Sequence, residues 1–211
     1  MRQLIRPADP AALRKYDYLV HNWDQQAPTT ADRDALWNGL LEMQGDRCAY
    51  CEATLGSTRH IEHFRSRSRF KNLTFSWSNL FGSCNELDSC GIYKDQKGRP
   101  YDPADLIKPD EEPPHIALRF FTDGRVEPRA DLPHGLARKA AETIRVFNLD
   151  EGGTLRARRR EAIRPFRIFL GELDSMRDEI SEAETIELIE TEIEHAAGAA
   201  HEGAIRQALI G

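Results

Sequence analysis

The sequence predicts an α+β fold, in which a mainly helical chain surrounds a small ββα element held together by its cysteines. All four cysteines of the 211-residue chain lie within residues 48–90. Apolar residues recur at helical spacing on both sides of that window. A short apolar run that begins at Ile116 and leads into an Asp-Gly pair indicates a small accessory β-hairpin.

Size and composition favour one domain, or one domain with an appended helical segment, since domains typically contain ~100–200 residues. A hydrophobic content of 40% and nine phenylalanines allow a real core. No apolar run approaches the ~20 residues that a membrane span needs. The first residues, through Pro7, lack the apolar stretch of a secretion signal. We therefore expect a cytoplasmic protein with no membrane partner.

Residues 1–44 are expected to form two helices that pack on the cysteine window. The first helix begins at Asp9 and runs through Trp23 with one apolar face. The second helix begins at Thr30, a favourable N-cap residue, and runs through Leu41.

Residues 45–100 are expected to contain the ββα element. Residues 61–64 have the composition of a short strand. Residues 75–82 mix apolar and polar side chains and suit a loop that enters a helix or a turn. The proline-rich segment 101–135 then carries the accessory hairpin, which turns at Asp123 and Gly124.

Residues 136–211 are expected to be helical and to end in an acidic tail. One helix ends near Asn148, and a longer one begins at Thr154, with Pro165 as a kink. An apolar stripe flanked by glutamates follows from Met176. The stripe indicates either a helix packed on its own protein or a docking helix for a partner.

The four cysteines are expected to bind a structural zinc ion. Cys48 and Cys51 form a Cys-x2-Cys knuckle, whereas Cys84 and Cys90 have five residues between them and form a wider one. In a reducing cytosol such a cluster favours metal ligands over two disulfides, which are the alternative. Because a unit of this size has little core of its own, zinc binding and folding should be coupled.

Charge is unevenly distributed along a chain whose net charge is −6. Residues 172–194 hold ten Asp or Glu and one Arg, so the acidity is concentrated late. The centre of the chain is basic and suits a phosphate backbone. The residues expected to contact nucleic acid are Arg65, Arg67, Arg69, Lys71 and Lys94.

The same window contains the residue types that phosphodiester hydrolysis needs. The reaction requires a base, a divalent ion and positive charge on the phosphate. His63 can serve as the base because imidazole titrates near neutral pH. Glu62 points to the opposite face of a strand and could reach a metal ion. Asn79 can bond a backbone carbonyl and an amide together, which would brace the loop that presents the histidine.

This combination resembles the HNH (ββα-metal) endonuclease family. The wider frame is similar to the PtuB family of Septu antiviral systems, which also occurs with retrons, over roughly residues 1–165. The matching stretches are Cys48–Glu52, Ile61–Arg65, Trp77–Leu80, Phe120–Val126, Thr143–Leu149 and Leu155–Arg158.

The resemblance implies a metal-dependent endonuclease with His63 as general base, Asn79 as the central Asn and Glu62 as a ligand of a catalytic divalent ion, Mg2+ or Mn2+. It also implies a nucleic-acid substrate, DNA or RNA, and a PtuA-type ATPase as partner.

The third residue of the family's motif, often His or Asn, is where this sequence departs. Counting from Asn79 gives Asp88, the preferred assignment, whereas alignment on the last cysteine gives Gly91. Asp95 and His60 are further candidates for the second metal ligand.

Other interpretations remain open from the sequence alone. Glu62 could form an ordinary ion pair with Arg59 or Arg65, Asn79 could cap a helix, and the basic run could be a solvated face. The chain could then be a non-catalytic zinc module that binds nucleic acid or a partner ATPase. It could also be a metal-stabilised scaffold without nucleic-acid contact.

Overall fold

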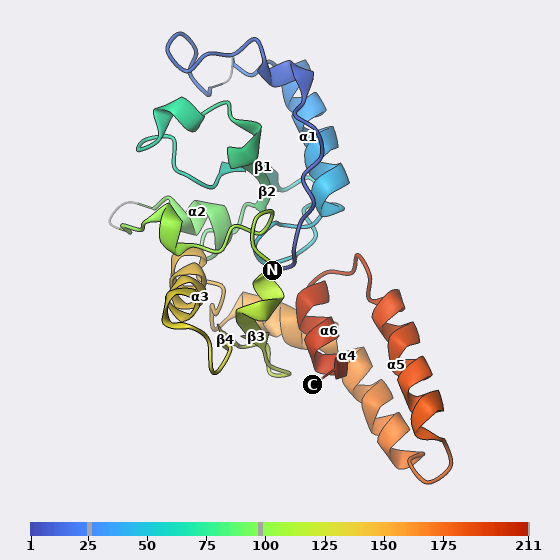
Figure 1. Cartoon of the computed structure of the whole chain (residues 1–211). Coiled ribbons are helices and arrows are strands. Elements are labelled where there is room, and N and C mark those ends of the chain that lie inside the picture. Colours follow the sequence, from blue (N-terminus) through green and yellow to red (C-terminus); the bar gives the residue numbers. More distant parts are fainter. Residues whose placement is uncertain (25–26, 97–98, 211) are drawn as a thin grey trace.

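The computed structural model describes residues 1–24, 27–96 and 99–210. It is mainly helical with two small antiparallel hairpins, so the predicted α+β class is confirmed at that level (Figure 1). The elements are α1 (Thr30–Gln44), β1 (Arg59–His63), β2 (Leu80–Cys84), α2 (Cys90–Lys94), β3 (Leu118–Phe120), β4 (Val126–Pro128), α3 (His134–Phe147), α4 (Thr154–Ser175), α5 (Glu182–His195) and α6 (Glu202–Ile210).

Strands β1 and β2 form the hairpin at the centre of the cysteine window. Glu62 pairs with Phe81 and His63 with Leu80 in antiparallel register, and α2 packs against β2. Sequence reasoning expected a loop where β2 lies. All five residues of β2 are buried, so the strand lacks the alternation of apolar and polar residues that identifies a half-exposed strand.

Helix α1 docks on β2 through Gln44. The Gln44 side-chain amide donates to the Gly82 carbonyl at 2.9 Å, and its oxygen accepts from the Gly82 amide at 2.8 Å. A Cβ at Gly82 would lie 3.0 Å from both Gln44 and Trp37, so a glycine permits this close approach. The N-cap of α1 is Thr29, one residue before the expected Thr30.

The helix predicted from Asp9 to Trp23 is wrong, because residues 11–13 form a single 3-10 turn and the rest is irregular. The Asp17 carboxylate accepts from the Leu19 amide at 2.8 Å, a local bond that competes with helical hydrogen bonds. Leu13 still reaches the core, but Leu19 and Val20 are about three-quarters exposed, so the middle of the apolar stripe covers no core.

The accessory hairpin, by contrast, forms as predicted from β3 and β4. Leu118 pairs with Pro128 and Phe120 with Val126. Gly124 in the turn has a φ of +90°, and a Cβ there would lie 2.2 Å from the Arg156 carbonyl oxygen. Glycine is therefore required both for the turn and for the contact with α4.

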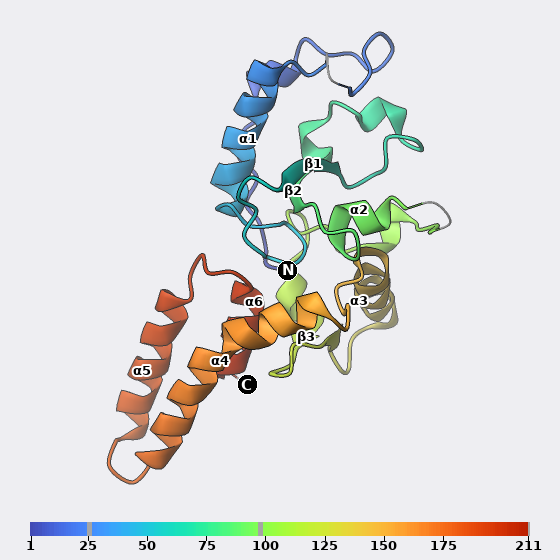
Figure 2. The same ribbon diagram turned by 180° about the vertical axis from the view of Figure 1, so that it is seen from behind.

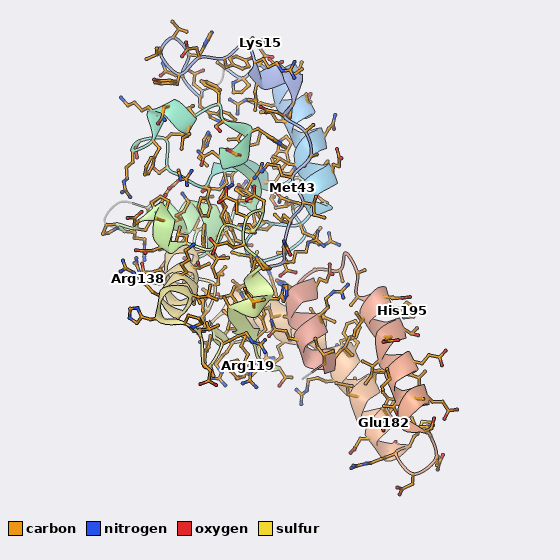
Figure 3. All side chains as sticks on the ribbon, viewed as in Figure 1. Lys15, Met43, Arg119, Arg138, Glu182 and His195 are labelled. Atoms are coloured by element: carbon orange, nitrogen blue, oxygen red, sulfur yellow. The ribbon has the colours of Figure 1, made fainter. Side chains whose placement is uncertain are left out.

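The C-terminal helices are arranged in two different ways. Helix α5 and the far half of α4, which contains Pro165, extend away from the remaining elements, as both views show (Figures 1 and 2). Figure 3 places Glu182 and His195 at the two ends of this projecting α5. Helix α6, which the sequence analysis did not separate from the rest of the helical segment, returns to pack on α4, α5 and β3.

One hydrophobic core contains residues from all four of the segments expected from the sequence. The boundaries between these segments therefore stay predictions. At its centre the Tyr50 and Phe147 rings stack with centroids 4.0 Å apart, and Phe64 and Phe81 pack beside them. None of the helices in the described ranges combines the length and apolar character that crossing a bilayer requires.

Candidate functional site

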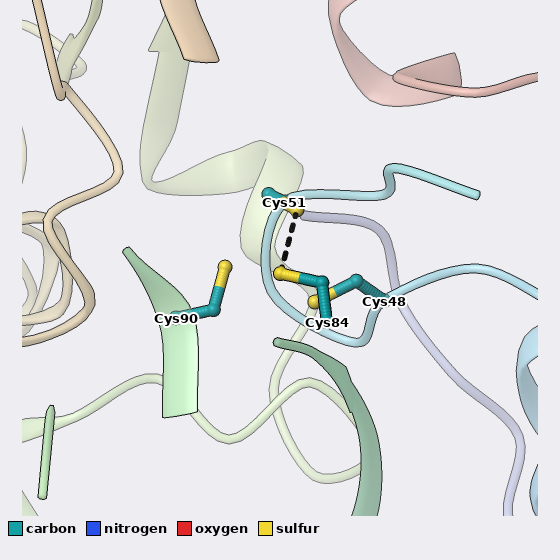
Figure 4. A group of neighbouring side chains, drawn as sticks. All are labelled: Cys48, Cys51, Cys84 and Cys90. Atoms are coloured by element: carbon teal, nitrogen blue, oxygen red, sulfur yellow. Dashed lines mark hydrogen bonds between the residues drawn. The ribbon is translucent and has the colours of Figure 1, made fainter. Parts of the chain in front are cut away.

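The fold brings the four cysteines together at one end of the β1–β2 hairpin. Cys48 and Cys51 lie in the turn before β1, Cys84 ends β2 and Cys90 begins α2 (Figure 4). Their sulfur atoms all lie within 4.8 Å of one another, and all four side chains are buried free thiols. Zinc–thiolate bonds of about 2.3 Å place tetrahedral sulfurs roughly 3.8 Å apart. The cluster therefore fits a structural metal ion such as zinc.

Electrostatics within the cluster favour a thiolate. Burial opposes ionisation of Cys48, but hydrogen bonds from the other three thiols outweigh it and hold the Cys48 pKa well below its usual range. Bonding to Cys48 raises the pKa of Cys51 and Cys90 in turn. A buried thiolate surrounded by three further sulfurs is an arrangement that attracts a soft divalent cation.

Helix α6 attaches to the first knuckle through residues that the sequence analysis did not single out. The His201 Nδ1 atom lies 2.7 Å from the Cys51 carbonyl oxygen, to which it donates. The buried Glu52 carboxylate accepts from the Gly203 amide at 2.8 Å. Some 150 residues separate these partners in sequence, so no local pattern could reveal the contact. The end of the described chain is therefore tied to the cysteine cluster.

His63 lies at the other end of β1 and is 4% exposed. Its Nε2 atom is 2.9 Å from the Thr74 carbonyl oxygen, which can only accept, so Nε2 carries the proton and Nδ1 is the basic nitrogen. The Trp23 ring packs edge-on against the imidazole at 4.6 Å. Burial lowers the pKa of His63 to about 4, although the bond to Thr74 opposes the change. The imidazole is therefore neutral at pH 7.

Asn79 connects the two strands to the loop that follows His63. Its side-chain oxygen accepts from the Arg65 amide at 2.8 Å, and its amide group donates to the Arg65 and Leu73 carbonyls at 3.0 and 3.1 Å. These three bonds make the brace that the sequence suggested. They fix both ends of the loop that leads to Thr74, the hydrogen-bond partner of His63.

Glu62 points away from His63 into a buried charge cluster. Its Oε1 atom lies 2.9 Å from the Lys94 ammonium, and its Oε2 atom lies 3.5 Å from His60 Nε2. Burial favours the neutral acid, but Lys94 and His60 outweigh it and lower the pKa of Glu62. Burial likewise opposes the charge on Lys94, and Glu62 and Asp95 overcome that and raise its pKa.

Of the candidates for a second metal ligand, Asp88 lies away from Glu62, whereas His60 contacts the Glu62 carboxylate and Asp95 shares Lys94 with it. Asp88 is exposed and lines a small cavity with Cys51, Glu151 and Arg158. Gly91 abuts Glu62 but has no side chain, and Asp95 pairs with Lys94. Among the described residues, only the four cysteines form a group of three or more His, Cys, Asp or Glu suited to a metal ion. As arranged, the residues around Glu62 do not fit a catalytic divalent ion.

The basic residues of the central window divide between two neighbouring clefts. Arg67 and Lys71 line a cleft of about 500 Å³ together with Trp23 and Thr74. His63 is not among the residues that line this cleft, but it contacts both Trp23 and Thr74. The second cleft shares Ser66, Ser68 and Asp95 with the first, and it contains Arg69, Arg99 and Tyr101.

Arg65 and Lys94 are less exposed than the other three residues that were expected to contact nucleic acid. Arg65 is half-buried. The Lys94 side chain is 0% exposed, so its ammonium faces Glu62 rather than a surface that phosphate could reach.

Comparison with known proteins gives one informative relative. Over 125 residues, 57% of the chain, the sequence is 27% identical to the Septu protein PtuB of Bacillus thuringiensis. The match covers 47% of that relative, so the chain spans about half of its length. No family model matches the chain. The similarity supports a Septu-related family.

Proposed function

We propose that the chain is a zinc-stabilised endonuclease of the HNH type that acts in a Septu-type antiviral system. The observation that carries the proposal is the environment of His63. A neutral imidazole is held by Thr74, and no hydrogen bond to its basic Nδ1 is present among the described residues. Its neighbours Trp23 and Thr74 line a cleft together with Arg67 and Lys71. The similarity to a Septu PtuB protein supports the antiviral setting.

In the proposed reaction, His63 takes a proton from water as the water oxygen bonds to the phosphorus of a nucleic-acid phosphodiester. The bond from phosphorus to the leaving sugar oxygen breaks, and that oxygen takes a proton from solvent water. Arg67 and Lys71 bind the phosphate and stabilise its developing charge. Asn79 holds the loop that carries both cations and the carbonyl of Thr74. Zinc, bound by Cys48, Cys51, Cys84 and Cys90, would fix the hairpin. The resemblance implies Mg2+ or Mn2+ as well, but the residues around Glu62, as arranged, do not fit such an ion.

A PtuA-type ATPase is the partner that the family resemblance implies, and we propose the projecting α4–α5 hairpin as its docking site. Its exposed apolar residues are Ile168, Met176, Ile186 and Leu188, on or beside the acidic helix α5. Deleting residues 172–211 would also remove the core residues of α6, so surface substitutions are the better test. Ile186→Asp with Leu188→Asp should abolish co-purification with the ATPase, whereas Ile5→Asp, at another exposed isoleucine, should not.

A second candidate function, a non-catalytic zinc module that binds nucleic acid or the ATPase, is favoured by one observation. In space, the Glu62 side chain abuts Gly91, which has no side chain to bind a metal ion. The Glu62 carboxylate is already paired with Lys94. The HNH resemblance implies a metal ligand at the third motif residue. If that residue is Gly91, the site lacks this ligand.

Cleavage of plasmid DNA, phage DNA and cellular RNA by the purified chain with its ATPase separates the two functions. We expect His63→Ala, at unchanged zinc content, to lose ~10²–10⁴-fold in rate, the usual contribution of a general base. His134→Ala, at the exposed first residue of α3 and outside both proposed sites, is the matched control and should cleave as the wild type does. Equal cleavage by wild type and His63→Ala, or none by either, would favour the binding module.

A further inference from the structure

Lys94 occupies the position of a bound cation. Its Nζ atom lies 2.9 Å from Glu62 Oε1, 2.5 Å from Asp95 Oδ1 and 3.1 Å from both the His63 carbonyl oxygen and the Tyr101 hydroxyl oxygen. Two carboxylates, a carbonyl and a hydroxyl are the kinds of oxygen donor that hard divalent cations take in proteins. In this chain the Lys94 ammonium donates hydrogen bonds to Asp95, His63 and Tyr101. It forms an ion pair with Glu62, whose buried Oε1 accepts no hydrogen bond from the described residues.

The Glu62 carboxylate occupies the space that a side chain at position 91 would need. A Cβ at Gly91 would lie 2.5 Å from Glu62 Oε2, so a larger residue there would force the carboxylate to move. His60 approaches the same oxygen at 3.5 Å. Both carboxylate oxygens of Glu62 therefore face nitrogen atoms of this chain, and the glycine is what allows them to do so.

We propose that the Lys94 ammonium is the resident cation of this site and closes it to divalent metal ions, so that the folded chain binds zinc at the cysteines and no second metal at Glu62. Glu62 then acts as a positioning residue. It holds Lys94, and Lys94 holds the backbone carbonyl of His63. The inference deepens the proposed nuclease function and rests on it only in assigning His63 as the reacting group.

The first measurement uses the intact wild-type chain. Zinc-loaded protein is equilibrated with Mn2+, and bound metal is measured by elemental analysis and by electron paramagnetic resonance. We expect one zinc per chain and no bound Mn2+ that depends on Glu62. A bound Mn2+ in the wild type that Glu62→Gln removes would overturn the proposal.

The second measurement frees the site. Lys94→Ala should gain one bound Mn2+ per chain and a Mn2+-dependent rise in melting temperature, because the ion replaces the missing ammonium. The gain should disappear in Lys94→Ala/Glu62→Gln. Lys108→Ala is a matched control, since Lys108 is another buried lysine between two carboxylates, Asp110 and Glu111. This variant keeps a protein cation at the site, because Arg6 lies 2.6 Å from Asp110. The variant should gain no Mn2+ signal of the same kind.

Each outcome decides the question. A folded Lys94→Ala that binds no Mn2+ shows that the position is not a cation site and overturns the proposal. If Lys94→Ala folds only with Mn2+, the proposal is supported, and if it does not fold at all, the wild-type measurement decides alone. Metal binding is read without any cleavage assay, so failure of the nuclease proposal and failure of this one are distinguished.

Discussion

The two ends of the β1–β2 hairpin handle buried charge in opposite ways. At the cysteine end, sulfur atoms converge within 4.8 Å and one thiol is driven toward ionisation by the others. At the histidine end, the Glu62 carboxylate converges instead on the ammonium of Lys94. The cysteine end requires a bound cation from outside to neutralise its thiolate charge. At the histidine end, Lys94 of α2 neutralises Glu62.

The contrast shows why similar stretches of sequence do not guarantee the same number of metals. A buried anion that lacks a protein cation is costly, and metal binding removes the cost. A buried anion that already faces a lysine gains little from an added ion, because the ion must first displace the lysine. The two ends should therefore respond very differently to chelators, substitutions and pH.

The largest expected effect is loss of the fold when the cysteine end loses its metal. Structural zinc sites provide roughly 10–16 kcal/mol in zinc-finger peptides, as much as the whole stability of an ordinary domain, ~5–15 kcal/mol. Chelation or Cys51→Ser should abolish the cooperative melt followed by circular dichroism. Ser83→Ala, beside Cys48 but outside the thiol set, is the control and should still melt cooperatively. An unchanged melt after complete metal removal would contradict the prediction.

The next effect concerns the brace at the histidine end. Asn79→Ala removes three part-buried hydrogen bonds to the backbone of Arg65 and Leu73. Water can replace some of these bonds, so we expect a total cost of ~1–3 kcal/mol, that of one buried group left unpaired. We expect chemical denaturation to show a loss in this range and hydrogen exchange at the Arg65 amide to become faster, with zinc retained. Asn72→Ala, at an exposed asparagine in the same loop, should change neither. Equal effects of the two substitutions would remove the special role of Asn79.

Local chemistry made part of the fold predictable from the sequence. A Thr cap predicted α1 to within one residue, the Asp-Gly pair predicted the β3–β4 turn, and cysteine spacing predicted a cluster that fits a metal. These signals act over a few residues or depend on one unusual residue type. The bonds of Asn79 were foreseen because an amide side chain matches a backbone donor and acceptor.

The remaining features depend on contacts between distant residues. The first helix fails because Asp17 bonds locally while its apolar neighbour Leu19 finds no partner surface. The burial of Lys94 depends on Glu62 and Tyr101 meeting around it. Spacing along the chain contains no information about such a meeting, so a basic residue was expected at the surface.

The pH dependence of stability should distinguish His63 from exposed histidines. Burial lowers the pKa of His63 to about 4 from the ordinary 6.5, so as pH falls below 6.5 the unfolded chain takes up this proton first. Folding stability is then lost down through pH 4, and nothing changes above 6.5. At pH 5.5 the loss is roughly 1 kcal/mol.

Denaturation of His63→Phe at pH 7.5 and pH 5.5 measures this contribution. The variant should lose about 1 kcal/mol less than the wild type between the two pH values. His195→Phe should lose as much as the wild type. Burial also lowers the pKa of His201 to about 4, so some pH dependence should remain in every variant that retains His201. A His63→Phe variant with the full wild-type loss would contradict the assigned pKa.

The smallest effect on the fold tests which surface the histidine end presents to nucleic acid. Lys71 is exposed and lines the cleft near His63, so Lys71→Ala should leave the melt unchanged. If Lys71 contacts phosphate, binding should weaken for all sequences, and the slope of log K against log salt should fall by about 1. Arg177→Ala, at the exposed turn between α4 and α5, removes an equal charge and should leave the slope unchanged. A common change in slope would mean that net charge alone governs binding, whereas a change confined to Lys71 would place the phosphate beside the neutral imidazole.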